Sequence, residues 1–221
     1  MQEIVKKTGR ILTPLLIYMT VSFFVTAAGV GMQQLRGKGP ETLDQALLTG
    51  ITAAFLLPVF YRLWQEDRKK YLPSAKKRKI PAWGYGAAFL TGALAAILGS
   101  GLIEAAGLKN HFSNEIQEGL FASALWAQLL GPGCLAPFME ELLYRGILYE
   151  RLREDFPIGM SMVIASLLFA IGHGNLIQTV YALPMAFLLQ LLYEKSGRLA
   201  LPMVFHMGAN LISIWAEHFG A

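Results

Sequence analysis

The sequence predicts an all-α membrane protein, a polytopic transmembrane helix bundle of seven or eight helices. Of its 221 residues 54% are hydrophobic and 15% are charged, and the mean hydropathy is positive, far from the averages of a soluble domain. The apolar residues also form long runs, each near or above the ~17 to 25 residues that cross a bilayer as a helix. These runs lie at residues 11–32, 46–61, 82–106, 119–149, 157–174, 176–193 and 199–219.

The first two runs predict an amino-terminal pair of helices. A basic start and the small residues Ala27, Ala28 and Gly29 give the first run some likeness to a cleaved signal peptide. At about twenty apolar residues the run is longer than a signal-peptide core, so we predict a membrane helix. We expect residues 1–81 to form a transmembrane hairpin with a basic cytoplasmic loop, and residues 82–221 to form the helix bundle that carries the chemistry.

The run at 82–106 has a small residue at every fourth position. Such a stripe lets another helix approach closely, either inside the bundle or in a homodimer. We favour packing inside the bundle, and the oligomeric state stays open. The stripe consists of Gly84, Ala88, Gly92, Ala96 and Ser100.

The run at 119–149 is too long for a single span and contains residues that break or kink a helix: Gly131, Pro132, Gly133 and Pro137. Two arrangements are open. An interfacial or half-membrane piece can precede a spanning helix from about 134 to 153, or one long helix can bend at the glycines.

The basic residues predict the orientation through the positive-inside rule. Fifteen of the nineteen Lys and Arg residues fall at the amino terminus and in loops on the same side of the membrane, at 62–79, 151–153 and 195–198. Arg36, Lys38 and Lys109 lie on the other side, and Arg145 lies inside an apolar run. We therefore predict a multi-pass protein of the cell membrane with a cytoplasmic amino terminus and, with seven spans, an external carboxyl terminus.

The remaining composition narrows the function. The net charge of +4 follows from this topology and from attraction to anionic lipid, so we predict no nucleic-acid partner. A lone cysteine, Cys134, excludes a disulfide framework within the chain and a metal site of several cysteines.

Three ionisable residues, Glu140, Glu141 and Arg145, stand inside an otherwise apolar segment. Each costs ~2.5 to 3.5 kcal/mol near the centre of a membrane helix, so the cluster indicates a functional site. Glu141 and Arg145 are spaced at i and i+4, which favours an ion pair along one helix face. Glu140 projects about 100° away. We expect Arg145 to neutralise Glu141 and to leave Glu140 available for chemistry.

Two further polar groups lie at a similar depth, His173 in one run and His206 with Asn210 at i and i+4 in another. With about 1.5 Å of rise per residue, Glu140, His206 and His173 lie roughly 16, 12 and at most 24 Å from the cytoplasmic side. We predict that these four residues converge on one site.

At these residues the chain resembles the CAAX protease and bacteriocin-processing (CPBP) family of intramembrane endopeptidases, also called the Abi family. The family signature is E-E-x-x-x-R, F-x-x-x-H and H-x-x-x-N. The chain has Glu140-Glu141-Leu-Leu-Tyr-Arg145, then Phe169-Ala-Ile-Gly-His173, then His206-Met-Gly-Ala-Asn210. The resemblance covers about residues 119 to 215, so it makes 82–221 a CPBP-like catalytic bundle.

The resemblance implies proteolysis within the membrane, in a cavity open to the cytoplasm. Glu140 would be the general base that activates water, with His173 positioning that water. His206 and Asn210 would donate hydrogen bonds to the developing oxyanion.

The same resemblance gives supporting residues. Glu141 and Arg145 would hold the geometry, and Tyr144 and Asn175 are candidates for groups behind the catalytic ones.

Other mechanisms and functions remain open. Zinc held by Glu140, His173 and His206 is the rival to a metal-free site; we favour no cofactor, because the Asn210 amide suits an oxyanion donor better than a zinc ligand. A non-catalytic membrane scaffold or immunity protein and a proton-coupled transporter are the alternative functions. The expected partners are the lipid bilayer and a membrane-associated peptide or protein substrate whose identity the sequence does not give.

Overall fold

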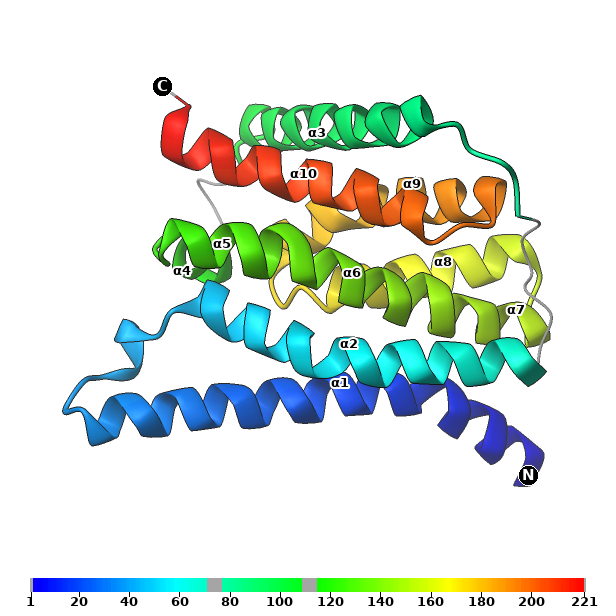
Figure 1. The fold of residues 1–221 in the computed structure, drawn as a ribbon, viewed down its shortest axis with the longest axis horizontal. Coiled ribbons are helices and arrows are strands. Elements are labelled where there is room, and N and C mark those ends of the chain that lie inside the picture. Colours follow the sequence, from blue (N-terminus) through cyan, green and yellow to red (C-terminus); the bar gives the residue numbers. More distant parts are fainter. Residues whose placement is uncertain (1, 71–76, 109–114, 221) are drawn as a thin grey trace.

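The computed structural model describes residues 2–70, 77–108 and 115–220, and within them the fold is all-α, with helices and no strand (Figure 1). Lys109, one of the basic residues used for the orientation, lies outside the described residues. The helices α1 to α4 are Gln2–Leu35, Gln45–Lys70, Ala82–Ala105 and Glu115–Phe121, with a short 3-10 turn, η1, at Pro40–Thr42. The later helices α8, α9 and α10 are Ile158–Ile171, Leu176–Ser196 and Ala200–Phe219.

The segment between α4 and α8 is one long bent helix. Its consecutive parts are α5 (Leu125–Leu130), the π-helical turn η3 (Gly131–Leu135), α6 (Ala136–Glu141), the π-helical η4 (Leu142–Tyr149) and α7 (Glu150–Asp155). Of the two predicted arrangements, the structure has the long helix bent at the glycines. With this segment counted once, the described residues form seven helices of 14 residues or more and the short α4.

The bend has a cause in the sequence. A proline ring clashes with the carbonyl four residues before it in a regular helix and supplies no N–H. Pro137 therefore favours a wider π turn, in which the Ala136 N–H donates to the Gly131 carbonyl five residues back. Gly131 also lets α2 approach, because a Cβ there would lie 2.4 Å from the Ala46 carbonyl oxygen.

Helices α3 and α10 pack against each other at very short range. A Cβ on Gly92 would lie 2.0 Å from the Phe205 carbonyl oxygen, and a Cβ on Gly208 would lie 2.2 Å from that of Phe89. Ala88 and Ala96 on the same face of α3 are buried. The predicted small-residue stripe therefore packs inside the bundle, although Ser100 at its end is exposed.

The helices differ in how much surface they leave for lipid. Four are long and apolar enough to cross a membrane, namely Lys6–Leu35, Gln45–Lys70, Ala82–Ala105 and Leu176–Ser196. Helix α8 is a shorter apolar helix, and the polar motif residues lower the hydropathy of α10.

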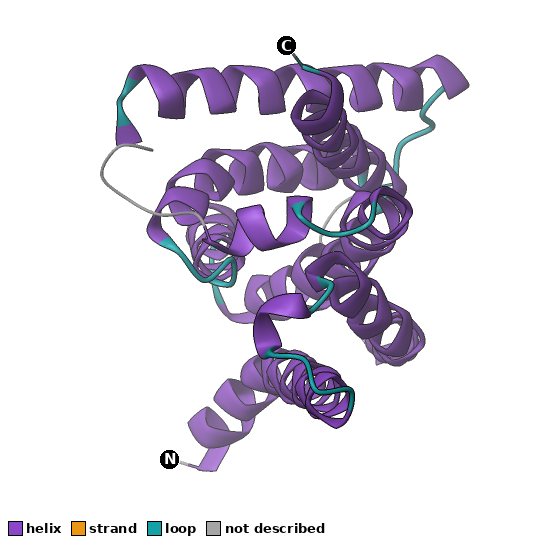
Figure 2. Ribbon diagram, turned by 90° about the vertical axis from the view of Figure 1, so that its left-hand side faces the viewer, coloured by secondary structure: helices purple, strands orange, loops and turns teal. Residues whose placement is uncertain are grey.

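In Figure 2 most helices are seen nearly end-on, and α3 crosses the top of the bundle. The protein is thus a multi-pass membrane bundle, with α2 contributing Leu56 and Phe60 to its core.

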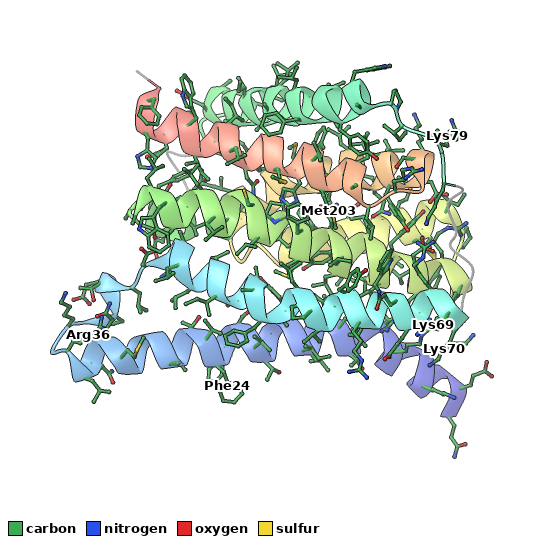
Figure 3. The ribbon with its side chains drawn as sticks, viewed as in Figure 1. Phe24, Arg36, Lys69, Lys70, Lys79 and Met203 are labelled. Atoms are coloured by element: carbon green, nitrogen blue, oxygen red, sulfur yellow. The ribbon has the colours of Figure 1, made fainter. Side chains whose placement is uncertain are left out.

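The two ends of the bundle differ in charge. Lys69, Lys70 and Lys79 lie at one end, on the right of Figure 3, and Arg36 lies at the other. At the basic end Arg10 donates to Glu154 at 2.6 and 2.8 Å, and Arg151 donates to Asp67 at 2.7 Å. The first residues of α1 lie at this end and the last residues of α10 at the opposite end, as an odd number of crossings requires (Figure 1).

Candidate active site

A cavity of about 320 Å³ lies inside the bundle, and four of the six predicted site residues line it: Glu140, His173, His206 and Asn210. They come from α6, the turn after α8, and α10. The predicted convergence of three separate motifs is therefore present. The other two predicted residues, Glu141 and Arg145, lie behind the cavity wall with no exposed side-chain surface.

Glu141 and Arg145 form the ion pair that their spacing predicts. Arg145 Nη1 donates to Glu141 Oε1 at 2.9 Å, and Nη2 donates to the Ala186 carbonyl of α9 at 3.1 Å. The guanidinium carbon also lies 4.6 Å from the centre of the Phe169 ring, a cation–π contact. This buried cation is thus held by three helices and fixes α8 and α9 against the helix that carries both glutamates.

His206 lies between the two carboxylates. Its Nδ1 is 3.0 Å from Glu141 Oε1, and its Nε2 is 3.7 Å from Glu140 Oε2. Since an ionised carboxylate only accepts hydrogen bonds, Nδ1 carries the proton in the Glu141 contact. The nitrogen that faces Glu140 and the cavity is therefore Nε2. Glu141 orients His206, while the Glu140 side chain keeps 19% of its surface exposed and lies on the cavity side.

His173 is oriented by its own helix. Its Nδ1 lies 2.9 Å from the Phe169 carbonyl oxygen, which can only accept, so Nδ1 carries the proton and Nε2 has a free lone pair when the ring is neutral. The Phe169 ring packs beside both histidines, with centroid distances of 4.8 Å to His173 and 5.8 Å to His206. Phe169 thus contacts Arg145, His173 and His206 at once.

Asn210 donates a hydrogen bond to the Pro132 carbonyl, which the π turn leaves without a backbone donor. Pro132 is followed five residues later by Pro137, which has no N–H, and the Ala136 N–H is already bonded to Gly131. The Pro132 carbonyl therefore lacks a helical donor. Asn210 Nδ2 supplies one at 2.8 Å, which leaves the second amide hydrogen free to point elsewhere.

The comparisons with known proteins concern this same segment. The family model described as type II CAAX prenyl endopeptidase Rce1-like matches residues 122–212. This segment is similar to that family. The predicted resemblance to the CPBP family is confirmed, and all six predicted site residues lie inside the matched range. The comparisons with curated proteins and with solved structures found no match.

The match supports a protease of the CAAX endopeptidase type that is embedded in a membrane. The Rce1-like segment comprises the bent helix and α8 to most of α10, whereas α1, α2 and α3 lie outside it. Helix α1 nevertheless contributes Tyr18 to the cavity, and α2 contributes Thr49.

The two candidates for supporting residues have different positions. Tyr144 is buried, lines the cavity and packs edge-to-face on Phe169 with a centroid distance of 5.0 Å. The Asn175 side chain caps α9 by accepting from the Gln178 N–H at 2.8 Å, and it does not line the cavity. Asn175 is therefore placed as a helix cap.

Sequence reasoning gave no role to Phe169, although the aromatic residue of F-x-x-x-H was visible as a motif position. It also missed Tyr18, for which the sequence carries no signal, because an aromatic residue in an apolar helix is ordinary.

The arrangement of the candidate zinc ligands bears on the metal alternative. Within the described part of the chain no three His, Cys, Asp or Glu side chains are grouped closely enough to hold a metal ion. Glu140, His173 and His206 therefore do not form a ligand set as they lie.

Proposed function

We propose that the protein is an intramembrane endopeptidase that hydrolyses peptide bonds of membrane-associated peptides or proteins, in the cell membrane with its amino terminus in the cytoplasm. The observation that supports this proposal is that two adjacent carboxylates occupy different positions. Glu141 is fully buried and paired with Arg145, while Glu140 borders the cavity beside His206 Nε2. A structural role for both glutamates gives no reason for one of them to face a cavity.

In the proposed reaction Glu140 takes a proton from water as the water oxygen attacks the scissile carbonyl carbon. His173 positions that water, because its Nε2 accepts a hydrogen bond when Nδ1 is held by the Phe169 carbonyl. The carbonyl oxygen becomes an oxyanion. Protonated Glu140 then gives its proton to the leaving nitrogen and the C–N bond breaks, which releases a carboxylic acid and an amine and returns Glu140 to its carboxylate form.

The oxyanion needs donors, and the proposal assigns them to α10. The free hydrogen of the Asn210 amide can donate once its partner hydrogen is held by Pro132. His206 donates from Nε2 when its ring carries both protons, with Nδ1 bonded to Glu141 and Nε2 facing Glu140 and the cavity. Both donors act in a cavity of low polarity, where electrostatic stabilisation of a developing charge is larger than in water.

No step of the proposal runs through a metal. A metal-free reaction predicts that activity survives exhaustive chelation of the purified protein. Stoichiometric zinc in active protein, lost together with activity on chelation and restored by zinc, would refute this part of the proposal.

The deciding experiment compares the peptides released from membranes that contain the wild-type protein or Glu140→Gln at equal expression. Glu118→Gln is the matched control, because Glu118 lies exposed on α4 and does not line the cavity. We expect products with wild type and Glu118→Gln that are missing with Glu140→Gln, and the cut sites will identify the substrate. Identical peptide sets from all three, with each protein folded, would favour the scaffold or immunity function instead.

A further inference from the structure

The cavity lies towards one end of the bundle. On the bent helix its lining residues recur every fourth position: Gln128, Pro132, Ala136, Glu140 and Tyr144. From Glu140 this stripe continues for twelve residues, roughly 18 Å, towards the start of α5 and for only four, roughly 6 Å, towards α7. On the bent helix Glu140 therefore lies one turn from the inner end of this stripe, which is Tyr144.

Helices α2, α3, α4, α8 and α10 line the cavity mainly from the same end, while α1 adds Tyr18 from its middle and the lining on α9 reaches Leu189. Helix α2 gives Thr49 near its first residue, and α3 gives Ser100 and Ile103 near its last. In α8 the lining begins at Phe169, eleven residues after the helix starts, and in α10 it begins at His206 and continues towards the carboxyl terminus. Helix α4, which lies wholly at this end, contributes Gln117, Leu120 and Phe121. Figure 1 shows α4, α5 and the end of α10 together on the left.

The opposite end is closed by packing. Leu143, Ile147, Leu148 and Tyr149 have no exposed surface, and Leu152 has 2%.

Crossed hydrogen bonds tie the same region to α9. The Tyr149 hydroxyl donates to Glu194 at 2.6 Å, and the Tyr193 hydroxyl donates to Glu150 at 2.5 Å. Beyond them, the Arg151–Asp67 bond joins α7 to α2. None of these residues lines the cavity, whose lining on α9 ends at Leu189, one turn before Tyr193.

The closed end is the basic end, which the charge distribution assigns to the cytoplasm. We infer that substrate reaches Glu140 from the non-cytoplasmic side of the membrane, through the end formed by α4, the end of α3 and the α8–α9 turn. Ser100 and Gly172 are exposed at that end and Gln117 is half-buried. This inference rests on the proposed function, and it differs from the cytoplasmic opening that the family resemblance implies.

The lining also restricts what enters. Between the surface and Glu140 the lining includes the neutral polar residues Thr49, Ser100, Gln117, Gln178, Tyr181 and Ser213. The Gln128 amide also lines the cavity, but it is already bonded to the Phe121 and Ser123 carbonyls and to His218. The described lining contains no Lys, Arg or Asp, and Glu140 is its one carboxylate. Amides and hydroxyls suit the backbone of an extended peptide, whereas a charged side chain would find no partner there. The substrate class is therefore an exported or membrane-anchored peptide, cleaved in an uncharged stretch on the non-cytoplasmic side.

The test is labelling of single cysteines in intact cells with a maleimide that does not cross membranes. In a Cys134→Ala parent, Ser100→Cys reports the cavity mouth, and Arg36→Cys and Lys69→Cys report the two ends of the bundle. We expect Ser100→Cys and Arg36→Cys to be labelled in intact cells and Lys69→Cys only after permeabilisation. Labelling of Lys69→Cys from outside, with Ser100→Cys protected until permeabilisation, would place the opening in the cytoplasm and overturn the inference.

A second readout uses the Glu140-dependent peptides. In the Ser100→Cys variant, external labelling is expected to lower their release at least fivefold, while labelling of Arg36→Cys leaves it unchanged. Full release after complete labelling at Ser100 would show that substrate uses another route and would refute the inference. Absence of Glu140-dependent peptides before any labelling would instead refute the proposed function, and with it this route, whatever the labelling pattern.

Discussion

Replacement of Arg145 by methionine tests how the bundle tolerates its buried charges. Arg145 and Glu141 have no exposed side-chain surface and lie 2.9 Å apart, so Arg145→Met leaves Glu141 as an unpaired buried carboxylate. Removing one partner of a buried pair costs about 3 to 5 kcal/mol. The substitution also removes the bond to the Ala186 carbonyl and the cation–π contact with Phe169. We expect Tm of the purified protein to fall by on the order of 10 °C.

A double-mutant cycle separates this electrostatic effect from a simple loss of packing. Glu141→Leu with Arg145→Met removes both charges and leaves apolar side chains of similar length, which is often neutral in other proteins. His206 then loses its Nδ1 acceptor, so recovery will be incomplete. Thermal unfolding in one detergent should show the double variant more stable than Arg145→Met alone. Destabilisations of the two single variants that simply add in the double variant would refute the coupling on which this reasoning depends.

Three other substitutions and one treatment test the remaining claims. Gly92→Ala places a methyl group 2.0 Å from the Phe205 carbonyl oxygen and should lower the free energy of unfolding by about 3 kcal/mol. Gly86→Ala on the same helix, where a Cβ meets nothing within 4 Å, should change Tm little. Equal effects of the two substitutions would contradict the close packing of α3 on α10. Asn210→Ala leaves the Pro132 carbonyl without its donor, so the free energy of unfolding should fall by about 1 to 3 kcal/mol and peptide release should fall as well. An unchanged Tm would argue against this hydrogen bond. Exhaustive dialysis against a chelator should leave peptide release unchanged, and metal analysis of the active protein checks this result.

The sequence determined the features that depend on short stretches of chain. Hydropathy gave the helices, because a bilayer requires long apolar runs whatever their packing. The i, i+4 spacing gave the Glu141–Arg145 pair, and the difference of about 100° between adjacent residues separated Glu140 from Glu141, because both follow from the pitch of a single helix. Pro137 and the glycines likewise predicted a bend, although its form as one continuous helix needed the structure.

Only the tertiary structure decided which atoms meet across helices. The contact of His206 with Glu141, the bond from Asn210 to Pro132 and the central place of Phe169 depend on how far each helix is rotated and shifted against its neighbours. Those shifts are set by side-chain packing over the whole interface, which the periodicity of one helix does not contain. The position of the cavity depends on these shifts too. Near α4 and the ends of α3 and α8 the helices leave a cavity between them, whereas at the basic end buried side chains fill the space between the helices.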